Sequence, residues 1–164
     1  MEHLLLSVHV LAGIVFVGGS AIATSLFPRY VPVAAPVTAP VAALVAAGAD
    51  ASVDDGRSRA VALALHRITR GYSLAGLVVP AAGLVLAFVQ GRTGEIWITL
   101  AVVLTAAAGF LLAVQIYPRQ RDALATPGDR ARLRPLSMMA GFYNVLWTIV
   151  VVLMIVRPGA GEGA

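Results

Sequence analysis

Four long uncharged stretches constrain the fold of this chain more than any other feature of its sequence. They run approximately over residues 4–27, 71–89, 96–117 and 136–156. The hydrocarbon core of a bilayer is roughly 30 Å thick, and about 20 residues of helix are needed to cross it. The sequence therefore predicts an all-α integral membrane four-helix bundle that forms a single membrane domain over residues 1–164.

The composition supports a membrane protein and excludes several kinds of chemistry. Hydrophobic residues make up 59% of the chain, charged residues 12%, and the mean hydropathy is +0.87, well above that of a soluble domain. The absence of cysteine and lysine excludes disulfide frameworks, cysteine zinc sites and lysine Schiff bases. The net charge of +4 is small and every basic residue is arginine, so the high pI does not indicate nucleic-acid binding.

The distribution of arginines predicts the orientation of the chain. Cytoplasmic flanks of membrane helices collect basic residues. Ten arginines lie in or beside the first and third connections, and only Arg92 and Arg157 lie on the opposite side. We therefore expect a multi-pass protein of a bacterial cytoplasmic (inner) membrane with both termini outside.

A loop insertion over residues 31–56 separates the first two stretches. Its first part is a tract of proline, alanine and valine that interrupts regular helix at Pro32, Pro36 and Pro40. Two interpretations stay open, a partly ordered linker and a short apolar helix on the membrane surface over residues 40–48. Residues 60–70 are expected to extend the second helix on the cytoplasmic side.

The two halves of the chain share a weak repeat. The first and third stretches end in Phe27-Pro28-Arg29 and Tyr117-Pro118-Arg119. Two explanations stay open. Either the bundle consists of two parallel-repeat hairpins related by an axis along the membrane normal, or these short motifs arose independently.

Two histidines are candidate ligands for haem or copper. His9 lies near the outer end of the first helix, level with Met154, whereas His66 lies at the inner end of the second, level with Met138 and Met139. The histidines should be roughly 25 Å apart along the membrane normal, which prevents them from being the two axial ligands of one haem. A histidine with a methionine suits low-spin haem or copper. Alternatively, the methionines fill packing gaps and His66 is solvated or contacts lipid headgroups.

Other polar side chains within the predicted helices are candidates for a site or for packing. Tyr143 and Trp147 share one face of the last helix, and Asn144 lies beside them near mid-membrane. An asparagine there needs a hydrogen-bond partner, such as Tyr143, Thr105 or a backbone carbonyl freed by Pro80. Interhelical hydrogen bonding and a cofactor or substrate pocket are both possible for this group and for Gln115.

Small residues and missing motifs narrow the function further. Glycines such as Gly13, Gly18, Gly76 and Gly83 predict faces where helices approach closely. The chain contains no metalloprotease, nucleophile-elbow, phosphate-loop or dinucleotide motif. The inner-loop acids all lie outside the predicted helices, so a proton-coupled carboxylate transporter is not expected.

The first helix carries His9, an aromatic residue seven positions later (Phe16), the pair Gly18-Gly19, and the closing Pro28-Arg29. In this pattern it resembles the opening helix of the copper resistance protein D-like superfamily of small bacterial membrane proteins. The family usually has tryptophan at the aromatic position and the closing pair in the opposite order. The resemblance covers about 25 residues and implies that His9 is a metal or haem ligand.

A more general likeness extends to the small four-helix protoporphyrinogen oxidase family, which binds haem b. It rests on the same helix, on Pro80-Ala81 and on the closing run from Ile155 to Pro158. That family uses a lysine and an Asn-Glu-Val-Pro segment, and this chain has neither.

Three classes of function follow as hypotheses. The first is a membrane component that binds haem or copper, and the second is a non-catalytic accessory or assembly subunit of a larger membrane complex. The third is a small permease. Expected partners are membrane lipid and either other membrane subunits or further copies of this chain.

Overall fold

The described part of the chain consists of helices and the segments that join them. The computed structural model describes residues 2–33, 59–76, 94–128 and 130–159, together with positions 81, 85 and 88, and it describes side chains from Leu11 onward. The helices, in chain order, are α1 (Glu2–Tyr30), a helix over residues 59–76, α3 (Ile96–Phe110), η1 (Leu111–Ile116), α4 (Tyr117–Ala125), η2 (Arg130–Leu133) and α5 (Arg134–Val156). No strand occurs in these ranges, so the predicted all-α class is confirmed for them.

Within the described ranges, three helical segments are long and apolar enough to cross a membrane. They cover Leu11–Tyr30, Ile96–Ala125 and Arg130–Val156. The expected extension at residues 60–70 is confirmed by the 59–76 helix, whereas most of the second stretch and of the 31–56 insertion lies outside the described residues.

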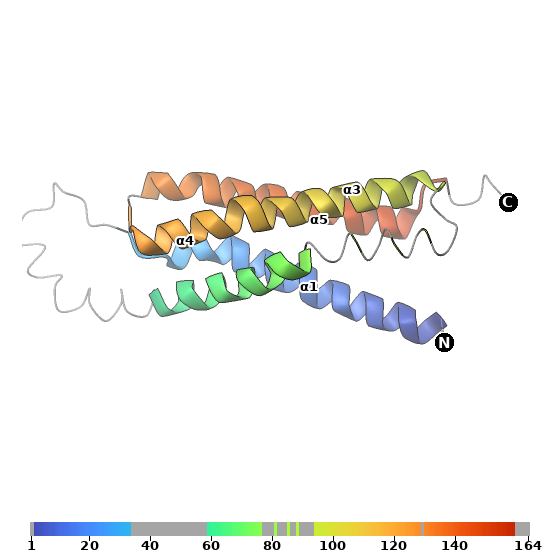
Figure 1. Ribbon diagram of the computed structural model, residues 1–164, viewed down its shortest axis with the longest axis horizontal. Coiled ribbons are helices and arrows are strands. Elements are labelled where there is room, and N and C mark those ends of the chain that lie inside the picture. The colour runs from blue at the N-terminus through green and yellow to red at the C-terminus, as the bar shows by residue number, and fades with distance from the viewer. Residues whose placement is uncertain are drawn as a thin grey trace, which may run out of the picture.

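Among the described residues, the helices pack side by side through α5 and through the 59–76 helix. α1 and α3 both pack along α5. The 59–76 helix lies between α1 and the α3–α4 helix, because Tyr72 contacts α1 and His66 contacts α4. Along the chain, α1, the 59–76 helix, the continuous α3–α4 helix and α5 run in alternating directions (Figure 1). Figure 1 also shows α1 diverging from α3 and α5 toward its first residue.

A π-helical turn, η1, joins α3 to α4 without ending the helix. The Tyr117 N–H donates to the carbonyl of Leu112, five residues earlier. The expected end at residue 117 is therefore wrong, and the helix continues to Ala125. The wide turn directly precedes Pro118, which lacks an N–H and whose ring would clash with the carbonyl four residues earlier in a regular α-helix.

The 59–76 helix and α3 touch through their backbones at Gly76 and Gly109. A Cβ added to Gly109 would collide with the carbonyl oxygen of Gly76, and one added to Gly76 would lie 3.4 Å from Gly109 Cα. Only glycine permits this approach. The close packing predicted at Gly76 is therefore confirmed.

A second close approach joins α1 to the same helix. A Cβ on Gly19 would lie 2.7 Å from Cζ of Tyr72. The close contact predicted along Gly13 and Gly18 is absent from the described structure, where nothing lies within 4 Å of a Cβ built at either position. Instead, α1 contacts the 59–76 helix through the side of α1 that carries Gly19.

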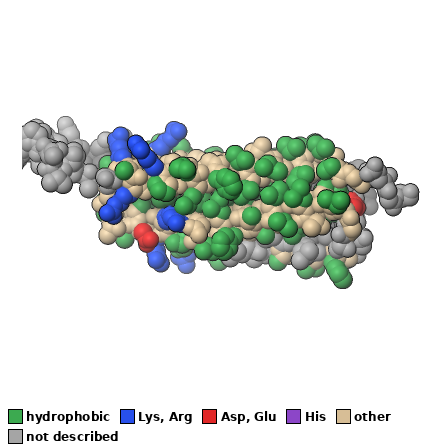
Figure 2. Space-filling model, turned by 90° about the horizontal axis from the view of Figure 1, so that it is seen from above, with side chains coloured by type: hydrophobic (Ala, Val, Ile, Leu, Met, Phe, Trp, Pro, Cys, Tyr) green, Lys and Arg blue, Asp and Glu red, His purple; other side chains and the backbone are tan. Residues whose placement is uncertain are grey.

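Charge is concentrated at one end of the packed helices, which we call the arginine end. It is formed by the last turn of α1, the first part of the 59–76 helix, α4, η2 and the first turn of α5, and it carries the arginines drawn in blue in Figure 2. Arg157 follows α5 at the opposite end, where its guanidinium carbon lies 5.8 Å from the centroid of the Trp97 ring. The indole N–H of Trp97 donates to Glu95 Oε2 at 2.6 Å. Between the two ends, the face in Figure 2 is largely apolar.

Candidate functional site

Four aromatic side chains meet between α1, the 59–76 helix and α5, and we call them the aromatic cluster. The Phe16 ring is at its centre, with centroid distances of 5.3 Å to Tyr72 and 5.5 Å to Trp147. Tyr143 lies 6.4 Å from Trp147, also edge to face. Offset and edge-on rings of this kind attract one another through their quadrupoles. Tyr143 and Trp147 therefore share the inward face of α5, as predicted.

Hydrogen bonds between α1 and α5 lie beside this cluster. The Tyr143 hydroxyl donates to Ser20 Oγ at 2.8 Å, and Ser20 Oγ donates in turn to the Val17 carbonyl at 3.1 Å. One turn further along α1, Asn144 Nδ2 donates to Ser25 Oγ at 3.0 Å. These two interhelical bonds, Tyr143–Ser20 and Asn144–Ser25, link α1 to α5.

The partner of Asn144 is a residue that the sequence did not point to. The amide nitrogen bonds to Ser25 on α1 rather than to Tyr143 or Thr105, and Pro80 lies outside the described residues. The physical reason is that α1 packs directly against α5, which brings the serine hydroxyl within reach of the amide. The packing interpretation thus accounts for the amide nitrogen of Asn144.

Two atoms of the same region lack a hydrogen-bond partner in the described structure. They are Asn144 Oδ1, an acceptor, and Trp147 Nε1, a donor, and both are buried. Buried polar atoms usually have a partner, so an unpaired donor and acceptor three residues apart on one helix need an explanation. One water molecule can accept from the indole N–H and donate to the amide oxygen.

A second polar group lies nearer the arginine end, between the 59–76 helix and α4. His66 stacks on Tyr117 with a centroid distance of 4.8 Å and nearly parallel rings. His66 Nδ1 lies 3.4 Å from Oε1 of Gln120, a fully buried residue whose Nε2 has no partner among the described residues. Burial lowers the pKa of His66, the hydrogen bond with Gln120 opposes that shift, and the charges of Arg121 and Arg70 add to it.

In the described part of the chain, no hydrogen bond or ring contact joins His66 to Met138 or Met139. The polar and ring contacts recorded for His66 are with Gln120 and Tyr117. Met138 is 75% exposed, and Met139 is half-buried against the apolar core. A histidine and methionine site at this end stays a prediction.

The other candidate pair lies at the opposite end. His9 belongs to α1, and its side chain lies outside the described part of the structure. Met154 is on the last turns of α5, partly exposed, and its carbonyl accepts a 3.2 Å hydrogen bond from Arg157 Nε. Gln115, the remaining polar candidate, lies on η1 and accepts hydrogen bonds from Arg119 Nη1 through its carbonyl and side-chain oxygens. Its side chain is thus paired within its own helix.

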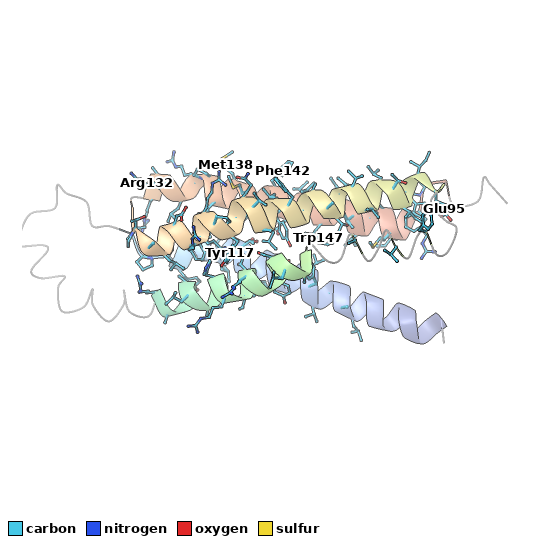
Figure 3. The ribbon with its side chains drawn as sticks, viewed as in Figure 1. Glu95, Tyr117, Arg132, Met138, Phe142 and Trp147 are labelled. Atoms are coloured by element: carbon cyan, nitrogen blue, oxygen red, sulfur yellow. The ribbon has the colours of Figure 1, made fainter. Side chains whose placement is uncertain are left out.

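A pocket of about 660 Å³ opens at the arginine end, between the end of α1 and the start of α5. Its charged and polar lining comprises Arg29, Arg130, Arg134 and Ser137. Met138 contributes to its apolar lining, and Figure 3 shows this residue on the outer side of α5. The sequence pointed to these arginines only as markers of orientation.

Among the described side chains, no group of three or more histidine, aspartate or glutamate residues lies close enough to hold a metal ion. The His9 side chain is not among them, so a haem or copper ligand at this position stays a prediction.

Comparison of the chain with protein-family models, curated proteins and solved structures gave no match. The likeness of α1 to the copper resistance protein D-like superfamily therefore rests on the residues quoted above.

Sequence reasoning missed Gln120, which it assigned to an arginine-rich loop. The buried residues Leu112, Ile116, Gln120 and Leu124 recur every four positions. That recurrence was the available signal, but it departs from the period of 3.6 residues that predicts a regular helix face. Ser20 and Ser25 were missed because small hydroxyl residues are common in membrane helices and usually bond to their own backbone.

Proposed function

We propose that this chain is an integral protein of a bacterial cytoplasmic membrane, with four membrane crossings and both termini outside. The large apolar side chains are mostly exposed on α1, α3 and α5, which suits surfaces in contact with lipid. The arginine end, rich in basic residues, would then face the cytoplasm. The contacts of α5 with α1 and α3, and those of the 59–76 helix with α1 and α4, support a four-helix bundle.

The proposed activity is the binding of haem b or copper at the end opposite the arginine end, with His9 as a ligand. The observation that carries this proposal is the position of Phe16. Its ring packs against Tyr72 and Trp147, so this side of α1 faces the other helices. His9 lies seven residues earlier, almost two full turns, and therefore belongs to the same side of α1.

The register between α1 and α5 supports Met154 as the second candidate ligand. Phe16 contacts Trp147, and Ser20 contacts Tyr143, so four residues back along α1 correspond to four residues forward along α5. Continuing this register brings position 9 level with position 154 along the helix axes. Because α1 diverges from α5 toward its first residue (Figure 1), a group held by both residues would have to span that separation. Neutral imidazole and thioether are a suitable donor set for low-spin haem and for copper. Either group would supply one-electron transfer when bound.

The test is a spectrum and an elemental analysis of the full chain purified in mild detergent. We expect a Soret band with stoichiometric iron, or stoichiometric copper, and we expect His9→Ala to abolish the signal. His3→Ala is the matched control, because it removes another imidazole near the same end of α1. A preparation with neither metal, or an equal loss in both variants, would overturn the proposal.

An accessory or assembly subunit is the second candidate. Its support is that the polar side chains Tyr143, Ser20 and Asn144 are used to pack α1 against α5, which leaves few polar groups in the described interior for chemistry. Such a chain would co-purify with other membrane subunits, and His9→Ala would not alter that association.

The membrane orientation can be tested separately, because the chain has no cysteine. Thr126→Cys adds a single thiol at the arginine end, and Gly159→Cys adds one after α5. In intact cells with a permeable outer layer, a membrane-impermeant maleimide should label the second variant and spare the first. The opposite pattern, or equal labelling, would contradict the orientation.

A further inference from the structure

The pocket at the arginine end gathers three cationic side chains without a recorded counter-charge. It is lined by Arg29 from α1, Arg130 from η2 and Arg134 from α5. In the residues that the structure describes, no carboxylate or other acceptor bonds to any of the three. Three guanidinium groups at one opening attract an anion, since each presents several fixed N–H donors.

The size of the pocket and its guanidinium groups favour a phosphate group over a smaller anion. The pocket is open to the surface, and its volume of about 660 Å³ leaves room for more than a small anion. Guanidinium groups bind phosphate oxygens through paired hydrogen bonds.

An apolar stripe begins at this pocket and continues along α5. Met138 lines the pocket, and Phe142 and Val145 follow at four and seven residues, which places all three on one face of the helix. All three are exposed, and Figure 3 shows the first two side by side on the outer side of α5. A ligand with a phosphate head and an apolar tail would match both parts.

We propose that this pocket binds the phosphodiester headgroup of an anionic phospholipid, with an acyl chain along the Met138 stripe. Basic pockets between membrane helices on the cytoplasmic side are suited to such headgroups. The proposal rests on the membrane orientation given above and is independent of haem or copper. The cysteine-labelling experiment tests the orientation by itself, so failure of one proposal can be told from failure of the other.

The experiment measures lipid retained by the full chain. Detergent-purified protein is incubated with phosphatidylglycerol or phosphatidylcholine, and bound lipid is counted by native mass spectrometry. The pocket variant combines Arg29→Gln, Arg130→Gln and Arg134→Gln. The control variant combines Arg67→Gln, Arg70→Gln and Arg121→Gln, which removes the same charge outside the pocket lining.

We expect one phosphatidylglycerol per chain, retained in preference to phosphatidylcholine. Because hydrogen bonds to charged groups are among the stronger ones, the pocket variant should bind at least about tenfold more weakly, whereas the control variant should bind as the natural chain does. Equal weakening in both variants, or equal retention of both lipids, would overturn the proposal.

Two further experiments distinguish lipid binding from the binding of a free anion and from a folding defect. Inorganic phosphate alone should fail to displace bound phosphatidylglycerol, and displacement would assign the site to a free anion and overturn the lipid. If the pocket variant does not fold, Ser137→Trp fills the opening at an exposed position without changing charge. It should also weaken binding about tenfold, and unchanged binding in that variant would contradict the proposal.

Discussion

Tyr143 on α5 donates a 2.8 Å hydrogen bond to the hydroxyl of Ser20 on α1, and both side chains are fully buried. This bond links residues 123 positions apart in the sequence. It lies beside the aromatic cluster, where no charged side chain is recorded in contact with it. We regard it as the main polar contact that sets the register of α1 against α5.

Tyr143→Phe should lower the free energy of unfolding by roughly 0.5–1.5 kcal/mol, the range for hydrogen bonds between membrane helices. The ring stays in place, so the change isolates the hydroxyl. Unfolding in mixed detergent, followed by circular dichroism, gives the value. Tyr30→Phe is the control because Tyr30 is exposed. In a double-mutant cycle with Ser20→Ala the two losses should not add, and additive losses would contradict a direct bond.

Gly109→Ala should destabilise the fold by about 1–3 kcal/mol, the usual cost of overpacking. The added methyl group would collide with the carbonyl of Gly76, which is backbone and cannot rotate away. Gly141→Ala is the matched control on α5, where nothing described lies within 4 Å of the new Cβ. Its effect should be neutral or favourable, because alanine is the better helix former. Equal effects would mean that the helices do not cross at Gly109.

The thermal stability should fall as the pH is lowered below about 6.5, because burial lowers the pKa of His66 in the folded chain from its ordinary value of 6.5. Between those two pKa values the unfolded chain binds a proton that folded His66 does not, so the pH decrease favours unfolding. Above 6.5 this contribution is flat. His66→Gln should remove the dependence while the other two histidines still titrate. If the thermal unfolding midpoint changes equally with pH in the natural chain and in His66→Gln, another titrating group causes the dependence.

Trp147→Phe should change the free energy of unfolding by less than about 1 kcal/mol, because it keeps an aromatic ring against Phe16 and removes an N–H without a recorded partner. Trp147→Ala should cost about 3–5 kcal/mol through the cavity it leaves. Chemical denaturation of the two variants gives the comparison. If the phenylalanine variant loses as much as the alanine variant, the indole N–H has a partner, such as a bound water or ligand.

Much of the fold followed from hydropathy, because uncharged stretches near 20 residues long leave few alternatives to helix. The shared face of Tyr143 and Trp147 also followed, since helical spacing alone determines it. The hydrogen-bond partner of Asn144, Ser25, could not be predicted from the sequence. It depends on which helix lies against α5, and the sequence pattern carries no information on neighbours.

The predicted end of the third helix was wrong for a different reason. Pro118 and the arginines after it are ordinary signs of a helix end. The π turn just before Pro118 accommodates the proline instead, and it allows four-residue steps from Leu112 to Leu124 to stay on the inner face. A single wide turn thus changes which residues are buried, including Gln120, without any composition signal.

The contact between Gly76 and Gly109 also sets how the 59–76 helix can move. Where two backbones touch, there is no side chain whose rotation could absorb a shift, so the crossing point acts as a fulcrum. Gly76 is the last residue of the 59–76 range, so a tilt about this contact would displace the opposite end of the helix most. The end bearing Arg59, which contacts the Leu124 carbonyl at 3.5 Å, lies farther from the fulcrum than His66 does and would therefore sweep the larger arc.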